Sequence, residues 1–256
     1  MGLSSSAPLS LSGNPTLVVN GALYVNRPLS GPNAVEISGN ASLSVNGTFA
    51  IQSGTRVHCA GRCSPAPYPP PATFDRPLPD PLAYLQPPSG AGLSMRTCSN
   101  CTSMQPGIYS SQVSLRGGTV TMAPGIYILR KGIDVAGNTT LTGSGVLLYN
   151  GCEREQPASC SAHGGAISLG GTGSASLSPL PSTDAAYPNV LIFQARNNDA
   201  ELSITGNSTT RSLSGLIYAP GSDGVAIGAG NGGLSIGWVV GTNLSVSGNG
   251  TVTVGP

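Results

Sequence analysis

The sequence predicts an all-β protein, a single-stranded right-handed parallel β-helix (β-solenoid), and three observations support this prediction. First, a small residue followed by Gly-Asn recurs before short strand-like segments, as in Ser12–Asn14, Ser38–Asn40 and Ser247–Asn249. Gly and Asn tolerate positive φ, so each phrase is a corner that leads into a strand. Second, the first two corners are 26 residues apart, a length typical of repeats that stack into solenoids. Third, apolar residues alternate along short segments, and no stretch keeps a period of 3.6.

The expected strands fall into three blocks, which cover residues 8–54, 107–149 and 190–254. Each strand has three to five residues and is bounded by Gly or Asn, which is typical of short β-strands between tight corners. Right-handedness follows from the general rule for parallel crossovers. We expect the inward side chains to include Leu17, Val19, Val45, Ile126, Ile128, Ile192, Ile217, Ile236 and Val246. Corner asparagines are expected to hydrogen-bond to one another along the stack.

We interpret residues 1–256 as one solenoid domain that contains an insertion over residues 55–106. This insertion holds about half of the 22 prolines and four of the 6 cysteines. Within it, Asp80–Leu85 is the only segment that suggests a helical turn or two. A loop this long is usually functional or cross-linked. The remaining residues suffice for about eight to ten turns of a solenoid.

Composition argues against several classes of function. Only 8% of residues are charged, against roughly 25% in ordinary globular proteins. The net charge is +1 and the arginines are scattered, so no basic face is available for nucleic acid or for an anionic membrane surface. No apolar run reaches the ~18 residues that a membrane-spanning helix needs. We therefore expect neither nucleic-acid binding nor membrane insertion.

The six cysteines form three local pairs, which are Cys59 with Cys63, Cys98 with Cys101, and Cys152 with Cys160. An even count beside loops favours disulfides in an oxidising compartment. One or two bonds between the first two pairs would close the neck of the insertion, and the third pair would close a hairpin loop. The alternative for the first two pairs is a structural zinc site, with His58 as a further ligand.

Several segments resemble the Gly-rich β-helical region of TadG-like proteins, which belong to bacterial tight-adherence (Flp) pilus-assembly systems. The resemblance is carried by Pro106–Tyr109, Gly117–Leu129, Gly132–Asn138, Gly143–Val146 and Leu213–Gly221, and by Asp80–Ala83 before a Pro-rich stretch. It covers most of residues 35–254. The resemblance implies a bacterial, extracytoplasmic, non-enzymatic β-helix, and it implies no catalytic residues or cofactor.

Few side chains suggest chemistry. Arg196, Asp199 and Glu201 form the densest cluster of charges, which a solvated turn after Val190–Phe193 explains better than a ligand contact does. Polysaccharide-cleaving β-helices need convergent carboxylates, and the 10 acidic residues are dispersed. Tyr68 and Tyr84 in the insertion are the tyrosines most available for stacking on sugars. We expect a structural or adhesive protein of the cell surface or a pilus, with a carbohydrate-binding or carbohydrate-cleaving β-helix as the alternative and no metal or cofactor.

Two further expectations concern surfaces. Thr-x-Thr pairs at 119/121, 140/142 and 251/253 are the kind of array that binds ice when it is flat, although ordinary β-propensity also explains them. The C-terminal segment is strand-like almost to its end and has no cap. We therefore expect the C-terminal turn to be an exposed end of the stack, which would join flanking domains or a second copy of the chain end to end.

Overall fold

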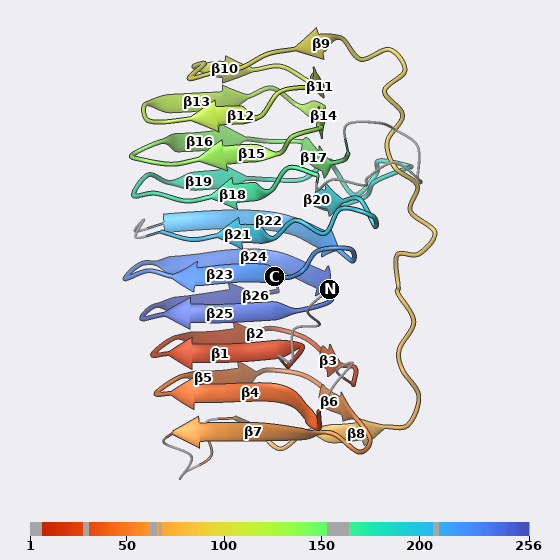
Figure 1. The fold of residues 1–256 in the computed structure, drawn as a ribbon, viewed down its shortest axis with the longest axis vertical. Helices are drawn as coiled ribbons and strands as arrows, with labels where there is room; N and C mark the ends of the chain where they lie inside the picture. The colour runs from red at the N-terminus through yellow and green to blue at the C-terminus, as the bar shows by residue number, and fades with distance from the viewer. Residues whose placement is uncertain are drawn as a thin grey trace.

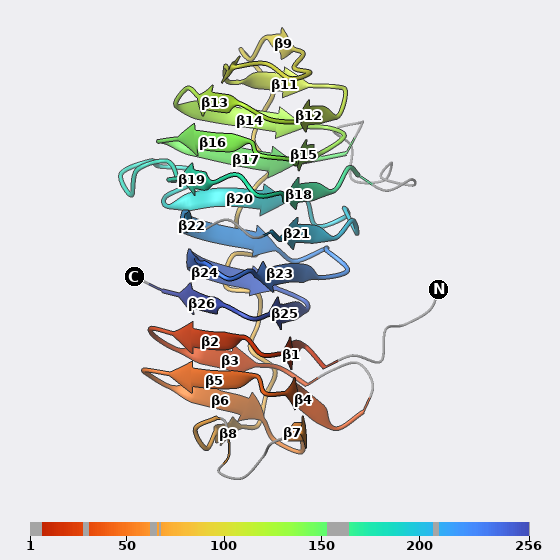
Figure 2. The same cartoon turned by 90° about the vertical axis from the view of Figure 1, so that its left-hand side faces the viewer.

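The structure is a computed structural model that describes residues 7–27, 31–61, 66, 68–152, 164–206 and 210–255. Within these residues the chain is all-β, with parallel strand pairing throughout and no helix. The strands stack in long columns, so that the molecule is a tall pile of similar layers (Figures 1 and 2). The described residues therefore include no helix that could cross a membrane.

The first sheet has nine strands, and each comes from a different layer of the pile. It consists, in spatial order, of β12 (Val113–Leu115), β15 (Ile133–Val135), β18 (Ile167–Leu169), β21 (Leu202–Ile204), β23 (Val225–Ala229), β25 (Leu244–Gly248), β1 (Leu9–Gly13), β4 (Asn33–Gly39) and β7 (Arg56–Gly61).

The second sheet has 14 strands and forms two columns, because two long strands, β22 (Thr210–Ala219) and β24 (Gly233–Gly241), each contribute one half to both. The second column of the pile holds β10 (Ser103–Met104), β13 (Thr119–Met122), β16 (Thr140–Gly143), β19 (Ala175–Leu177), the first halves of β22 and β24, β26 (Thr251–Val254), β2 (Thr16–Val19) and β5 (Ser42–Val45).

The third column begins with β9 (Met95–Arg96), β11 (Gly107–Tyr109), β14 (Gly125–Leu129), β17 (Val146–Asn150), β20 (Val190–Gln194) and the second halves of β22 and β24. Lower in the pile, a separate three-stranded sheet contains β3 (Leu23–Val25), β6 (Phe49–Gln52) and β8 (Ala72–Phe74).

Order along the chain differs from order in space. The N-terminal layers stack beneath the C-terminal layer, since Leu9 of β1 lies opposite Leu244 of β25 and Thr16 of β2 lies opposite Thr251 of β26. The expectation that the C-terminal turn is an exposed end is therefore wrong, because it lies in the middle of the pile with paired strands on both sides. The ends of the pile are formed by β7 and β8 at one side and by β9 and β10 at the other (Figure 1).

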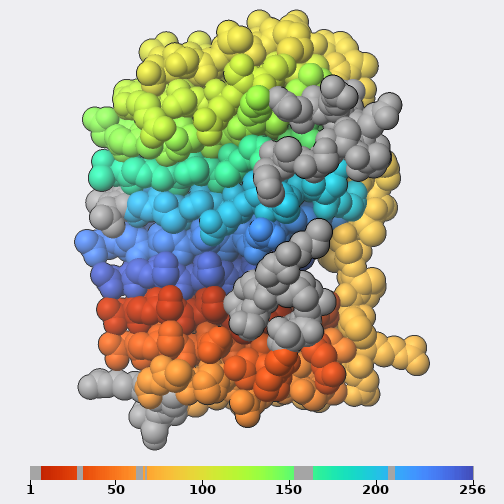
Figure 3. All heavy atoms as spheres, viewed as in Figure 1, coloured from red at the N-terminus to blue at the C-terminus, as the bar shows by residue number. Residues whose placement is uncertain are grey.

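This arrangement obliges the chain to travel from one end of the pile to the other. Residues 75–94, which we call the strap, do so in an extended path outside the third column (Figures 1 and 3). Residues 56–61 and 103–104 are strands of the pile, so the segment outside the sheets is shorter than the expected insertion of 55–106. Asp80–Leu85 forms a turn rather than a helix, in which the Leu82 amide donates to Asp80 Oδ1 at 2.9 Å.

Two apolar cores lie on opposite sides of the third column. The main core fills the space between the columns and contains most residues expected inside, including Leu17, Ile192 and Val246, with Val45 partly buried against it. Ile128 instead belongs to a second core beneath the strap, and Ile126 packs against that core. Both were expected in the main core. Both side chains point to the outer face of the third column instead. The strap covers that face, so apolar residues of this column are buried on both faces.

The Gly-Asn corners are confirmed, and the 26-residue spacing places the first two of them on neighbouring layers. Asn40 Nδ2 donates to Asn14 Oδ1 at 2.8 Å across 26 residues, and Asn14 Nδ2 donates to Asn249 Oδ1 at 2.9 Å. These asparagine side chains thus link the C-terminal layer to the N-terminal layers. Gly39 has a φ of +72°, and a Cβ there would lie 2.5 Å from the carbonyl oxygen of Gly13 in the adjacent layer. Corners stack this closely only because they lack side chains.

One local disulfide lies within the described residues. Cys98 and Cys101 form a disulfide, so they neither bond to the other pair nor serve there as zinc ligands. The expected neck closure is wrong, because Cys59 lies on β7 at the opposite end of the pile from Cys98 (Figure 1). Cys59 and Cys152 are also disulfide-bonded. Cys63 and Cys160, their expected partners, lie outside the described residues.

The close stacking of corners leads to a stability test with a matched control. Gly39→Ala places a methyl group against the Gly13 carbonyl in addition to forcing positive φ, whereas Gly31 has a φ of +79° with nothing within 4 Å of a Cβ. We expect Gly31→Ala to lower the free energy of unfolding by about 1–2 kcal/mol. Gly39→Ala should cost about 1–3 kcal/mol more. Urea unfolding of both variants measures the difference, and equal losses would show that the corners do not restrain the stack.

Candidate functional site

The outer side of the second column carries a long row of hydroxyl side chains, which we call the hydroxyl face. Register pairs link one outward position from layer to layer along almost the whole pile, and only Val18 interrupts the hydroxyls. In spatial order the positions are Ser103, Thr121, Thr142, Ser176, Ser212, Ser235, Thr253, Val18 and Ser44. Their inward neighbours, such as Val120 and Leu141, are buried in the main core, which fixes the outward orientation of the row.

A second row lies two residues away on part of the same face. Thr119 lies opposite Thr140, and Thr251 lies opposite Thr16, which in turn lies opposite Ser42. Ser42 Oγ donates to Thr16 Oγ1 at 3.1 Å. Neighbouring strands are spaced by ~4.8 Å and alternate residues of one strand by ~6.6 Å, so the two rows form a regular grid of hydroxyls on a rigid sheet.

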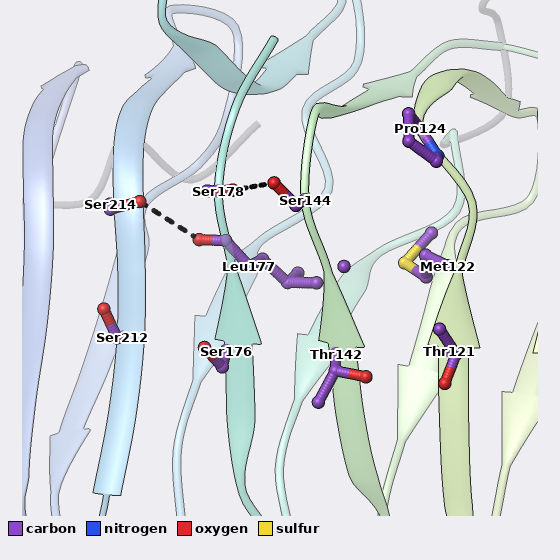
Figure 4. Close-up of a pocket in the computed structure, with 11 residues that line it drawn as sticks. Thr121, Met122, Pro124, Thr142, Ser144, Ser176, Leu177, Ser178, Ser212 and Ser214 are labelled. Atoms are coloured by element: carbon purple, nitrogen blue, oxygen red, sulfur yellow. Dashed lines mark hydrogen bonds between the residues drawn. The ribbon is translucent and has the colours of Figure 1, made fainter. Parts of the chain in front are cut away.

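The face is hollowed where the second column turns into the third. The hollow has a volume of about 510 Å³. Figure 4 shows two rows of polar side chains across the strands, Thr121, Thr142, Ser176 and Ser212 in one, and Ser144, Ser178 and Ser214 in the other. Leu177 and Met122 lie between the rows. Ser178 Oγ donates to Ser144 Oγ at 3.0 Å, whereas Leu177 and Met122 are buried in the main core. The hollow therefore offers mainly hydroxyl groups to a ligand.

The hydroxyl face is electrically neutral along the nine positions of its main row. The outer side of the first sheet, by contrast, carries charged side chains, since the Arg116 guanidinium pairs with the Asp134 carboxylate and Glu36 lies opposite His58. Arg211 belongs to the strand β22 but points inward and is buried. The face therefore offers hydrogen bonds and contact area without electrostatic attraction.

Arg211 has a structural role at the corner between the first and second sheets. Its guanidinium donates to the carbonyl oxygens of Leu169 at 3.2 Å and Gly171 at 3.0 Å, and also to that of Thr205. Burial lowers the pKa of Arg211 from its usual value. These carbonyls lie at or just beyond the ends of β18 and β21. The buried arginine thus adds donors to backbone carbonyls at the point where these strands of the first sheet stop.

The candidate ligand contacts named from the sequence do not come together. Tyr84 lies on the strap and is 68% exposed, whereas Tyr68 is partly buried against the main core. Asp199 and Glu201 are exposed in the corner after β20. That corner is built on buried amides, since Gln194 Nε2 donates to the Asn198 carbonyl at 2.9 Å and to the Ala200 carbonyl at 2.6 Å. These residues form a structured turn that faces solvent.

Arg196 anchors the strap. Its guanidinium donates to the carbonyl oxygens of Leu85 at 2.9 Å and Leu82 at 2.8 Å, and it lies over the rings of Phe193 and Tyr218 at 5.9 and 5.4 Å. The arginine of the sequence cluster therefore contacts this chain's own backbone and rings. Its surroundings are those of a residue that holds two segments together.

Tyr218 provides the second anchor. Its hydroxyl donates to Asp80 Oδ2 at 2.6 Å, and the side chain is buried in the second core. Burial, together with the hydrogen bond to the Asp80 carboxylate, raises the pKa of Tyr218 to about 12. Asp80 thus holds the turn of the strap through one oxygen and the third column through the other.

Sequence reasoning identified the threonine pairs but missed the serines that continue the row, notably Ser176, Ser212 and Ser235. Turns differ in length, since 26 residues separate Asn14 from Asn40, whereas 34 separate Ser144 from Ser178. A fixed sequence period therefore could not show which serines lie opposite the threonines on neighbouring strands. The available signal was the polar residue at the middle of each short strand, as in Ala175–Leu177.

Within the described residues, no three His, Cys, Asp or Glu side chains gather in a way that could hold a metal ion. No family model, no curated protein and no solved structure matches the chain. The site is therefore defined by its geometry alone.

The Tyr218 anchor gives a pH-dependent stability test. Because its folded pKa is raised to about 12 from the ordinary tyrosine value of 10.0, the contribution of the neutral phenol is complete below about pH 10 and is lost as the pH rises toward 12. Tyr218→Phe should lower the free energy of unfolding at pH 7 by about 1.5–3 kcal/mol, and it should flatten the decline of stability between pH 10 and 12. Tyr84→Phe, at an exposed position, is the control and should change stability by less than about 0.5 kcal/mol. Identical pH profiles of the wild type and Tyr218→Phe would contradict the assignment.

Proposed function

We propose that this chain is a right-handed parallel β-helix that acts as a non-enzymatic structural and adhesive element outside the bacterial cytoplasm. The helix assignment is supported by the order of the strands, because successive strands such as β1, β2 and β3 enter the first, second and third columns in turn. The next three strands, β4 to β6, repeat that order one layer further along. A chain that winds through three columns in this way forms a coil.

The observation that carries the adhesive function is the hydroxyl face. A ligand with a repeating, neutral, hydroxyl-rich surface would meet the same donor and acceptor groups in every layer. Each hydroxyl contributes little by itself, since net hydrogen-bond energies are about 1 kcal/mol. A rigid row of them, however, adds many contacts at little cost in conformational entropy. An ordered polysaccharide of a cell surface or matrix has this chemistry.

An extracytoplasmic location agrees with the cysteines. The described cysteines are all disulfide-bonded, and such bonds persist mainly in oxidising compartments. A role at the cell surface or on a pilus is part of the same proposal.

Ice is the second candidate ligand, and a separate observation favours it. The pairs Thr119/Thr121 and Thr140/Thr142 lie side by side in register, so four threonine side chains form a small flat array at one end of the hydroxyl face. The row beyond them is mostly serine. Measurement of thermal hysteresis separates the two candidates, since a polysaccharide-binding protein should leave the freezing point unchanged.

A charge placed on the hydroxyl face tests the proposal. Thr142→Lys and Ser176→Lys introduce an ammonium group into the hollow, which should weaken binding to insoluble polysaccharides by ~10-fold or more, the equivalent of about 1.4 kcal/mol. Co-sedimentation with cellulose, chitin and peptidoglycan provides the measurement. Ser168→Lys, at an outward position of β18 on the first sheet, is the matched control and should bind like the wild type.

Equal loss in all three variants would indicate a general charge effect, and no binding by the wild type to any polysaccharide or to ice would refute the function. Circular dichroism of each variant confirms that the stack remains folded.

A further inference from the structure

One end of the pile is closed by a shortened turn of the chain, residues 95–104, which we call the cap layer (Figure 1). This segment passes through all three columns, because β9 pairs with β11 in the third, Ser99 bridges Ser114 in the first, and β10 pairs with β13 in the second. It thus completes a turn with far fewer residues than the 26 that separate Asn14 from Asn40 on neighbouring layers.

So short a turn has few backbone bonds to the layer beneath it. β9 and β10 have two residues each, and the first column receives the single bridge at Ser99. The bend that follows also needs an unusual backbone, since Asn100 has a φ of +51°, a left-handed conformation that asparagine tolerates better than most residues. The Cys98–Cys101 disulfide spans this bend and therefore holds the part of the cap layer that backbone pairing holds least.

In the first column, this bend covers the edge of β12. The Asn100 amide donates to the Ser114 carbonyl at 2.9 Å, and Asn100 Oδ1 accepts a hydrogen bond from the Arg116 amide at 2.9 Å. The Cys98 side chain is buried in the main core, and Cys101 packs against that core. The disulfide loop thus closes both the strand edge and the end of the core on this side.

In the second column, the cap layer covers β13. The amides of Thr121 and Ala123 donate to the carbonyls of Thr102 and Met104, respectively, at 3.1 and 3.0 Å. The Met104 side chain is buried in the main core. Ser103, between these two carbonyl-bearing residues, is the first position of the hydroxyl face. The bond that holds the cap layer in place therefore also fixes one end of that face.

The disulfide is accessible to a reductant. Cys101 is half-buried, and the residues around it in the sequence, Ser99, Asn100 and Thr102, are exposed. A thiolate can therefore approach the Cys101 sulfur from the end of the pile. Accessible disulfides exchange with thiols more readily than buried ones. The bond thus combines a structural role with chemical accessibility, which a redox-sensitive device requires.

We propose that the Cys98–Cys101 disulfide is a redox-sensitive latch that keeps the cap layer closed. A dithiol reductant attacks Cys101 Sγ, the S–S bond breaks, and Cys98 leaves as a thiolate that takes up a proton. The second thiol of the reductant then displaces Cys101 as a thiol. The reductant becomes a disulfide, and the protein gains the two hydrogens that the reductant loses.

Reduction opens the cap layer and leaves the other layers folded. Each layer of such a stack contacts only its neighbours, so the opening of a terminal layer does not require the next layer to unfold. The open form frees the edges of β12 and β13 and removes Ser103 from the hydroxyl face. Oxidation closes the cap layer again, which completes this end of the stack in an oxidising compartment.

Amide hydrogen exchange of the full chain measures the opening directly. On reduction with dithiothreitol, the amides of Asn100, Arg116 and Thr121 should exchange ~10-fold faster or more, because the disulfide no longer restricts the conformations of the open layer. The Gly170 amide, which donates to the Val135 carbonyl deeper in the pile, should exchange at an unchanged rate. Reoxidation should restore the slow exchange.

Two double variants separate this bond from the other disulfides, which the reductant also breaks. Cys98→Ser with Cys101→Ser should show the fast exchange without reductant, and dithiothreitol should add nothing further at Asn100. Cys152→Ser with Cys160→Ser removes two cysteines outside the cap layer and is the matched control, which should exchange like the wild type. Circular dichroism confirms that both variants are folded.

The latch is overturned if reduction leaves the exchange of Asn100 and Arg116 unchanged, since hydrogen bonds alone would then hold the cap layer. It is also overturned if exchange at Gly170 rises by the same factor, because the disulfide would then stabilise the whole stack. Neither outcome depends on whether the hydroxyl face binds a polysaccharide.

Discussion

The whole structure depends on parallel backbone pairing between layers, and the corners decide whether that pairing can continue. Each layer must place its N–H and C=O groups opposite those of the next at ~4.8 Å. At Gly13 and Gly39 the corners approach so closely that a Cβ would lie 3.0 and 2.5 Å from a carbonyl oxygen of the adjacent layer. The side chains of Asn14, Asn40 and Asn249 then hydrogen-bond across the same layers. The repeated Gly-Asn pair therefore allows the layers to pair at these positions. The glycine leaves room for the neighbouring carbonyl, and the asparagine forms a side-chain hydrogen bond to the next layer.

That ladder does not require the chain to be continuous from layer to layer. The register of β1 on β25 is as regular as that of β4 on β1, although the first pair joins opposite ends of the sequence. The consequence is a long return path, which the strap supplies. Proline keeps the strap extended and outside the sheets, while Arg196 and Tyr218 bind its backbone and the Asp80 carboxylate. The second core beneath it explains why the third column is apolar on both faces.

Much of this fold could be predicted from the sequence, because the determining signals are local. The corners, the alternation in strands such as Thr16–Val19, and the stacking of Asn14 with Asn40 all follow from residues a few positions apart or from one clear repeat. The order of the layers could not be predicted, because every layer has similar strand edges. No short-range sequence signal indicates that β1 pairs with β25. For the same reason the C-terminal turn was expected at an end. The face on which Ile126 and Ile128 are buried depends on the strap, which comes from a distant part of the sequence, so it could not be predicted either.

The candidate site illustrates a related limit. Catalytic sites are found in sequences through rare residues with distinctive chemistry. Here the arginine that stood out, Arg196, holds the strap, and the acidic residues Asp199 and Glu201 are exposed in a turn. The residues left for binding are serines and threonines, which are common and individually uninformative. Their significance arises only when register brings Thr142, Ser176 and Ser212 into one row. Selectivity on such a surface has to come from spacing and flatness rather than charge, so a ligand that matches it must itself be periodic.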